Sequence, residues 1–181
     1  MYNLKKESII FLSLIFINFG CESKRDAIGA DNEIIVICSD VDKDNVESFL
    51  SSIFNDSLYT PEPEPFYVLK FSSPESYSKL KKQTNIVVAA IDRDPTNTGL
   101  KLINNILPVK QRKNMVSNDP IILAKNVHAN HQMFMVINAN SYEHLLGFVD
   151  KKRDYIKKNF NEKFNFRQSR FLFSQNNINT I

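Results

Sequence analysis

The side chains that could carry out chemistry are few and lie in two short segments. His128 and His131 stand three residues apart, and Asp92 and Asp94 flank one arginine just before Pro95. Imidazole and carboxylate groups together can bind a metal ion or act as general acid and base. These residues therefore define one possible function, a metal-dependent or acid/base hydrolase that uses the His128/His131 and Asp92/Asp94 pairs.

The spacing within each pair favours a structural explanation instead. On a strand, an offset of three directs two side chains to opposite faces, so His128 and His131 would share an ion only within a tight turn. Asp-x-Asp-Pro is a common turn sequence, since aspartate oxygens accept hydrogen bonds from the backbone that follows. We therefore expect no metal and no cofactor, we favour a protein that is not an enzyme, and the hydrolase is kept as the alternative.

Two further patterns are weaker. Asp40, Asp42 and Asp44 have the alternate spacing of a calcium loop but lack its glycine and its closing glutamate, so we expect them to cap a helix. The formal net charge of +3 is too small to indicate a nucleic-acid partner.

The first 21 residues have the features of a secretory leader. Two lysines precede an almost wholly apolar run over residues 9–19, which is about half the ~20 apolar residues that a spanning helix needs. The run ends at Gly20-Cys21, where lipoprotein leaders place the cysteine that receives diacylglycerol, although Asn18 stands where an aliphatic residue is commoner. We predict a signal peptide over residues 1–20 and lipidation of Cys21. Cleavage near residues 27–29 and an uncleaved inner-membrane anchor are the alternatives.

Lipidation of Cys21 would decide the location of the protein and the state of the second cysteine. Several acyl chains hold a protein firmly on a membrane, at ~0.8 kcal/mol per buried methylene. We therefore expect a protein of the cell envelope, anchored by lipid to a membrane outside the cytoplasm. Cys38 would have no disulfide partner, and its place at the end of an apolar run predicts a buried thiol.

The rest of the chain predicts one α+β domain over residues 33–166. Runs of apolar and β-branched residues predict five strands, at residues 33–39, 66–71, 85–91, 121–127 and 133–139. Apolar residues at helical spacing predict helices, at residues 46–54, 74–80, 100–106 and 142–164. This order predicts a mixed or antiparallel sheet with helices on one face, for which a ferredoxin-like arrangement is the specific form we expect.

The domain is expected to be flanked by two irregular segments. Residues 21–32 predict a tether, and residues 167–181 predict an irregular C-terminal tail. Phe166, Phe171 and Phe173 lie beyond the regular apolar spacing of the long helix, so they are candidates for an exposed surface that contacts a partner.

Several of these segments together are similar to a family of uncharacterised bacterial envelope lipoproteins that is known only as a domain of unknown function. The segments that carry the resemblance are Ile28–Val36, Pro61–Phe66, Asn85–Val88, Ala129-x-x-Gln132 and Glu162–Phe166. The resemblance implies an envelope location and supplies no catalytic residues. Members are expected to continue past this length, so the chain would correspond to roughly the N-terminal half of the family.

We therefore expect a membrane-tethered envelope lipoprotein that acts as a binding or scaffolding module. Its partners would be the membrane, through the N-terminal lipid, and an envelope protein or glycan, with no role for nucleic acid.

Overall fold

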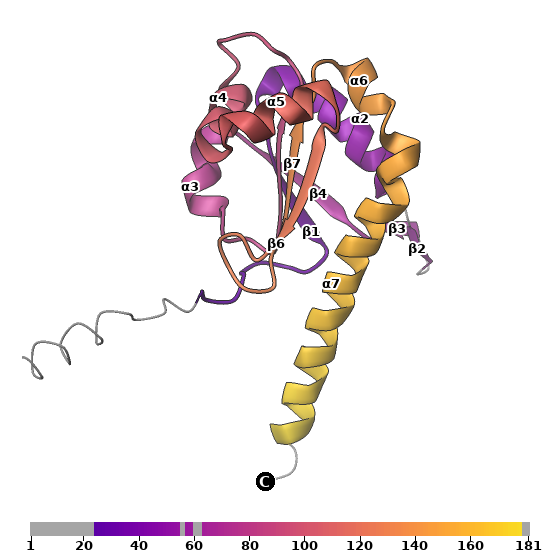
Figure 1. Ribbon diagram of the computed structural model, residues 1–181. Helices are drawn as coiled ribbons and strands as arrows, with labels where there is room; N and C mark the ends of the chain where they lie inside the picture. Colours follow the sequence, from indigo (N-terminus) through magenta and orange to yellow (C-terminus); the bar gives the residue numbers. More distant parts are fainter. Residues whose placement is uncertain (1–23, 55–56, 60–62, 179–181) are drawn as a thin grey trace, which may run out of the picture.

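A five-stranded mixed sheet forms the centre of the molecule (Figure 1). The computed structural model describes residues 24–178 except 55–56 and 60–62. The strands lie in the order β4 (Val68–Ser72), β1 (Glu33–Ile37), β5 (Asn85–Ala90), β7 (Met133–Asn138) and β6 (Ile121–Lys125). The first four are parallel to one another, and β6 is antiparallel to β7. The expected α+β fold with five strands is confirmed, and of the two expected kinds of sheet, mixed or antiparallel, the structure has the mixed one.

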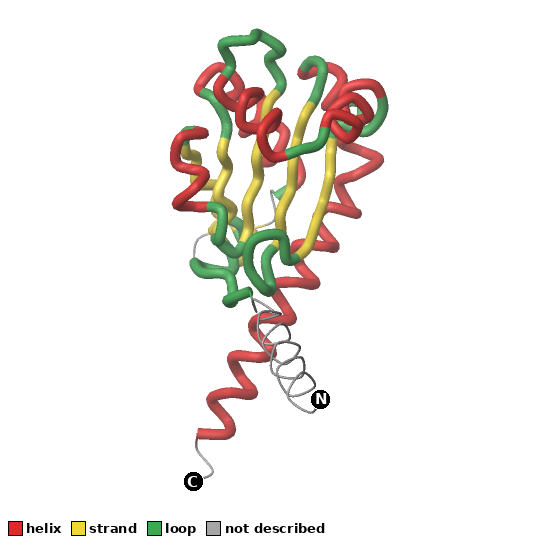
Figure 2. Tube along the Cα trace, turned by 60° about the vertical axis from the view of Figure 1, so that its left-hand side comes forward, coloured by secondary structure: helices red, strands yellow, loops and turns green. Residues whose placement is uncertain are grey.

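The helices cover both faces of the sheet, whereas we expected them on one face. One face packs against α2 (Lys43–Ile53), α6 (Tyr142–Leu146) and α7 (Val149–Ile178), and the other against α3 (Tyr77–Leu80), α4 (Thr98–Ile106) and α5 (Val109–Ser117) (Figures 1 and 2). Every side chain of β5 and β7 is buried, so both faces of these central strands need a cover. The parallel pairs also show that the ferredoxin-like expectation, which needs antiparallel neighbours, is wrong.

The remaining elements are short. The 3₁₀ turns η1 (Asp40–Asp42) and η2 (Pro74–Ser76) precede α2 and α3, and β2 (Ser57–Tyr59) pairs with β3 (Pro63–Pro65) in a separate antiparallel ribbon. The polar region between β5 and β6, for which the sequence predicts one short helix, also contains α5, which buries Met115. Among the described helices, none is both long and apolar enough to cross a membrane.

Both flanking segments have more structure than the sequence predicts. The α7 helix continues through the expected irregular tail to Ile178. The described part of the expected tether packs against the domain: Ala27 is buried, and its backbone N–H donates to the Asn130 carbonyl at 2.9 Å. Arg167 of α7 reaches back to this segment and donates to the Ala27 carbonyl at 3.1 Å.

Two edges of the sheet have different surroundings. The edge where the four parallel strands end, next to α4, α5 and η1, is called the carboxyl edge. The edge where they begin is called the base. The described chain starts at the base with Lys24, and α7 projects from it (Figure 1).

Candidate functional site

The carboxyl edge contains the point at which the chain reverses its winding. Neighbouring strands β1 and β5 are followed by α2 and α4, which lie on opposite faces of the sheet. In open sheets with parallel strands, ligands usually bind in the crevice that such a reversal leaves. The side chains at the ends of β1 and β5 are therefore the first candidates for a site.

Asp42 closes this crevice. Its side chain is 1% exposed, and Oδ1 accepts a hydrogen bond from the Asp92 N–H at 2.7 Å. Oδ2 accepts from Asn97 Nδ2 at 2.8 Å and from Ser39 Oγ at 3.1 Å. Asp42 stands at the N-cap position of α2, as expected, but its carboxylate accepts no capping hydrogen bond and instead joins the loops after β1 and β5.

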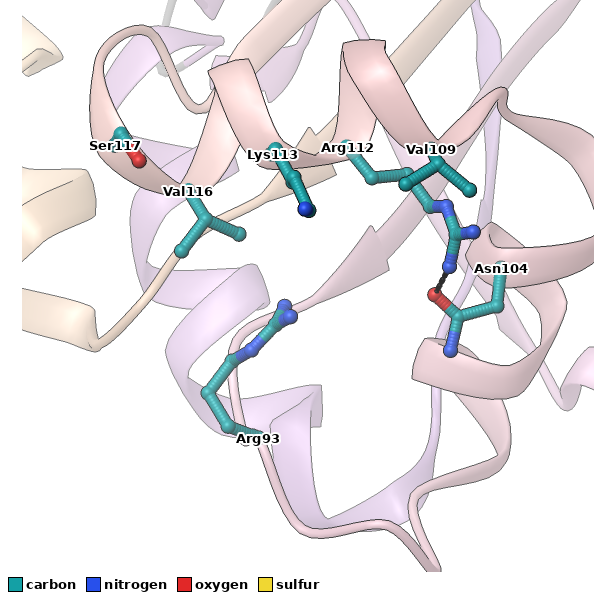
Figure 3. A pocket seen from close by; sticks show the side chains of 7 residues that line it. All are labelled: Arg93, Asn104, Val109, Arg112, Lys113, Val116 and Ser117. Atoms are coloured by element: carbon teal, nitrogen blue, oxygen red, sulfur yellow. Dashed lines mark hydrogen bonds between the residues drawn. The ribbon is translucent and has the colours of Figure 1, made fainter.

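The open cavity of the carboxyl edge lies beside this network, between α4, α5 and the loop after β5 (Figure 3). Its volume is about 350 Å³. Three of its seven lining side chains are cationic and none is acidic. We call it the basic pocket, and it is lined by Arg93, Asn104, Val109, Arg112, Lys113, Val116 and Ser117.

Hydrogen bonds to neighbouring strands and helices fix the two arginines. Arg93 donates from Nη1 to the Asn138 side-chain oxygen at 2.6 Å, at the end of β7. Arg112 donates from Nη1 to the Asn104 side-chain oxygen, which joins α5 to α4 (Figure 3). Arg112 Nε is buried and has no hydrogen-bond partner among the described residues.

The electrostatics of the basic pocket favour an anion. Burial and then the positive charge of Arg112 lower the pKa of the Arg93 guanidinium, and the carboxylate of Asp42 opposes them without cancelling the decrease. Both effects penalise the charged form of a side chain that stays protonated in proteins. An anion between the two guanidinium groups would offset that penalty by accepting charge-assisted hydrogen bonds.

The structure does not bring the expected hydrolase residues together. Asp92 and Asp94 follow β5 at the carboxyl edge, whereas His128 and His131 lie in the loop before β7 at the base. The six residues of β5 separate these edges by roughly 20 Å. Within the described part of the chain, no three histidine, cysteine, aspartate or glutamate side chains gather in a group that could hold a metal ion.

Each of these pairs has its own structural contacts. Asp92 Oδ1 accepts from the Asp94 N–H at 3.0 Å, and Asp94 Oδ1 accepts from the Thr96 N–H at 2.7 Å. These hydrogen bonds confirm the turn interpretation, and those from Thr96 lower the pKa of Asp94. His128 Nε2 lies 2.7 Å from the Tyr77 hydroxyl, and His131 has a positive φ of 59° and lies beside Arg170. The two imidazoles thus have different partners.

Of the predictions for the two cysteines, the structure tests the one for Cys38. Cys38 is buried and free, as predicted, and burial together with Asp42 and Asp40 raises the pKa of its thiol to about 12. Such a thiol is a poor nucleophile. Cys21 lies outside the described residues, so its lipidation remains a prediction.

Of the three phenylalanines expected to form a partner surface, the structure describes the side chain of Phe166. Phe166 is 49% exposed at the base, on α7, and its ring centroid lies 5.1 Å from that of His131. It borders a cavity of about 260 Å³ with Lys125, His131 and Lys163. Phe171 and Phe173 lie on the same helix beyond the described side chains, so their part in a partner surface remains a prediction.

The basic pocket is the feature that reasoning from sequence missed. Its lining comes from three elements spread over residues 93–117, and no helix was predicted where α5 lies. A signal is nevertheless present: Val109, Arg112, Lys113 and Val116 have the i, i+3, i+4, i+7 spacing of one helix face, and Pro108 stands directly before them.

The fold and the pocket define a class: a small α+β domain with a mixed five-stranded sheet and a cationic cavity at its carboxyl edge. A family model described as a domain of unknown function, DUF8532, matches residues 27–172, and the chain belongs to that family. The matched region includes the segment packed at the base and most of α7. Comparisons with curated proteins and with solved structures gave no significant match.

Proposed function

We propose that this protein is a membrane-tethered lipoprotein of the bacterial envelope whose domain binds an anionic group, a carboxylate or a phosphate, in the basic pocket. One observation carries the binding part of this proposal: Arg93, Arg112 and Lys113 share a cavity that no acidic side chain lines. Arginine recognises planar carboxylates and phosphates through paired hydrogen bonds, and lysine adds a point charge.

The size and lining of the pocket favour binding over catalysis. Its volume of about 350 Å³ lies at the lower end of the ~300–1,000 Å³ typical of ligand sites. It therefore suits a small anion or the acidic group of a larger envelope protein or glycan. No histidine, cysteine or carboxylate lines it to act as nucleophile or general base.

The tether is supported by the sequence alone. The apolar run of residues 9–19 ends at Gly20-Cys21 and is followed at once by a charged segment. The test is metabolic labelling with a clickable fatty acid in a bacterial host, comparing the wild type with Cys21→Ala. We expect label on the wild type only, and equal labelling of both would refute lipidation at this residue.

The pocket is tested by titrating the purified full chain with inorganic phosphate and, separately, with citrate, followed by calorimetry. We expect saturable binding, and the stronger of the two ligands identifies the acid group. Removing one charged hydrogen bond should weaken binding about tenfold, equivalent to about 1.4 kcal/mol. Lys113→Gln should therefore bind less tightly.

A matched control lies on the same helix. Lys110 and Lys113 are both exposed on α5, and only Lys113 lines the pocket. Lys110→Gln removes the same charge from the protein and should leave binding unchanged. Binding that fails to saturate, or that both substitutions weaken equally, would show that the pocket is not an anion site.

A further inference from the structure

Hydrogen bonds hold the first described residues against the base. Lys24 Nζ donates to the Asn126 carbonyl at 2.7 Å and to the Val127 carbonyl at 3.0 Å. The Asn130 N–H donates to the Arg25 carbonyl at 2.9 Å. The chain is therefore held from Lys24 onward, and only two residues separate Lys24 from Cys21.

The α7 helix leaves the domain at the same place. Arg167 Nε lies 2.5 Å from Asp31 Oδ1, and Arg170 Nη1 lies 3.8 Å from Asp26 Oδ2. Residues 171–178 then project past these contacts as helix (Figures 1 and 2). Their axial length is about 12 Å, at ~1.5 Å per residue.

These two lengths decide which part of the protein meets the membrane. The three-residue step from Cys21 to Lys24 spans at most about 10 Å. The sheet is roughly 20 Å high, so a tether of this length cannot pass around the domain to bring the carboxyl edge to the bilayer. With so short a tether the base would face the membrane, and a helix that projects about 12 Å from the base is long enough to reach the headgroups.

We infer that the projecting end of α7 and the cationic base form a surface that contacts anionic lipid headgroups. This inference rests on the membrane tether of the proposed function. It places the basic pocket, on the opposite edge, facing away from the membrane.

The charge of the base matches such a surface. Burial lowers the pKa of His128, and the charges of Lys81, Lys24 and Lys82 lower it further, so these three cations lie near that imidazole. Arg25 and Arg170 are also exposed there. The carboxylates described at the base each lie beside a cation: Asp26 beside Arg170 and His131, Asp31 beside Arg167, Glu33 beside Lys70, and Glu162 beside Lys125. Cations within about a Debye length of anionic lipid, ~10 Å, are attracted to it.

The composition of α7 at its exit also suits the interface. Arg167 and Arg170 are followed by Phe171-Leu172-Phe173. Aromatic rings next to cations are favoured at the level of lipid headgroups, where the ring is buried and the charge stays hydrated. Phe166, half-exposed on the same helix, adds apolar surface at the base.

The chain contains no tryptophan, so one introduced indole reports on one position. We would place it at the end of α7 with Phe173→Trp and at the opposite edge with Val109→Trp, where the side chain is 56% exposed. The full chain is reconstituted into vesicles of phosphatidylcholine with or without phosphatidylglycerol, and quenching by brominated lipid is measured. Leu172→Trp serves as a second probe if Phe173→Trp does not fold.

We expect severalfold stronger quenching of Phe173→Trp than of Val109→Trp on vesicles with phosphatidylglycerol, and less quenching on neutral vesicles. Arg25→Gln with Lys82→Gln should reduce the quenching on anionic vesicles, whereas Lys101→Gln with Lys110→Gln, at the opposite edge, should not. Equal quenching of the two probes would overturn the inference. So would unquenched probes in a chain that sediments as a dimer, because α7 would then contact a second copy.

Each measurement is repeated in Cys21→Ala, whose apolar leader stays as an anchor in place of the lipid. Equal label on the two proteins, or label on neither, with quenching of Phe173→Trp would refute the lipid tether and leave the contact surface standing. Label on the wild type only, without quenching in either protein, would refute the contact surface alone.

Discussion

Lys163 should make the stability of this protein depend on pH between about pH 7 and pH 10. Its side chain is 8% exposed on α7, and Nζ donates to the Thr84 carbonyl and to Asn85 Oδ1, both at 3.0 Å. Burial lowers the pKa of this amine to about 7, and Arg167 contributes to the decrease while Asp31 opposes it. An unfolded chain would have the ordinary lysine pKa of ~10.4.

The sign and size of the effect follow from these two values. Between about pH 7 and pH 10 the unfolded chain binds a proton that the folded chain does not, so the free energy of unfolding rises with pH. Below about pH 7 both forms are protonated, and the cost of burying the charge is fully present. One pKa unit corresponds to ~1.4 kcal/mol, so stability should rise by about 2 kcal/mol from pH 7 to pH 9.

Urea unfolding at a series of pH values measures this slope. Lys163→Met keeps the unbranched apolar stem and removes the titrating amine, so the rise of about 2 kcal/mol should disappear. Lys158→Met is the matched control, because its side chain lies on the same helix, is 73% exposed and should leave the slope unchanged. A methionine variant at position 163 that keeps the wild-type slope would refute the reasoning.

Three further substitutions or labels test the packing of the carboxyl edge. Gly99→Ala would place a methyl carbon 2.8 Å from a backbone carbonyl of β5 and should lower the unfolding temperature, whereas Gly147→Ala has 3.6 Å of room and should not. Asp42→Ala leaves buried donors unpaired and should lower the free energy of unfolding, measured in urea, by about 2–4 kcal/mol. The control is Asp40→Ala at an exposed position, which should change this free energy by less than about 0.5 kcal/mol. The thiol of Cys38, with a pKa of about 12, should resist maleimide at neutral pH until the chain unfolds, and mass spectrometry would detect early labelling if this is wrong.

The sequence predicts the strands well because each has a strong local signal. All five expected strands are present to within a few residues, as is the helix that begins near Asp42. Ser141 stands directly before α6 and caps it by accepting from the His144 N–H at 3.2 Å. Alternation, β-branching and capping act between neighbours in the chain, so they can be recognised without knowledge of the fold.

The sequence predicts the candidate site poorly, because the residues that form it are distant in the chain. No local feature of the sequence indicates that Arg93, in a turn, and Arg112, on a short polar helix, line the same cavity. Only the packing of α5 over β7 brings them together. For the same reason the aspartate and histidine pairs, which suggested a hydrolase, lie at opposite edges of the sheet.

By itself, then, the sequence determined the α+β class, the five strands and the buried state of Cys38, because hydrophobic patterning and turn chemistry are local. The tertiary structure alone decided that helices cover both faces, that Asp42 joins two loops and that Lys163 is buried. It also decided that three cations share the carboxyl edge while the start of the described chain and α7 share the base. Those outcomes depend on strand order, since parallel neighbours bring the ends of β1, β5 and β7 to one edge whatever their separation in the chain.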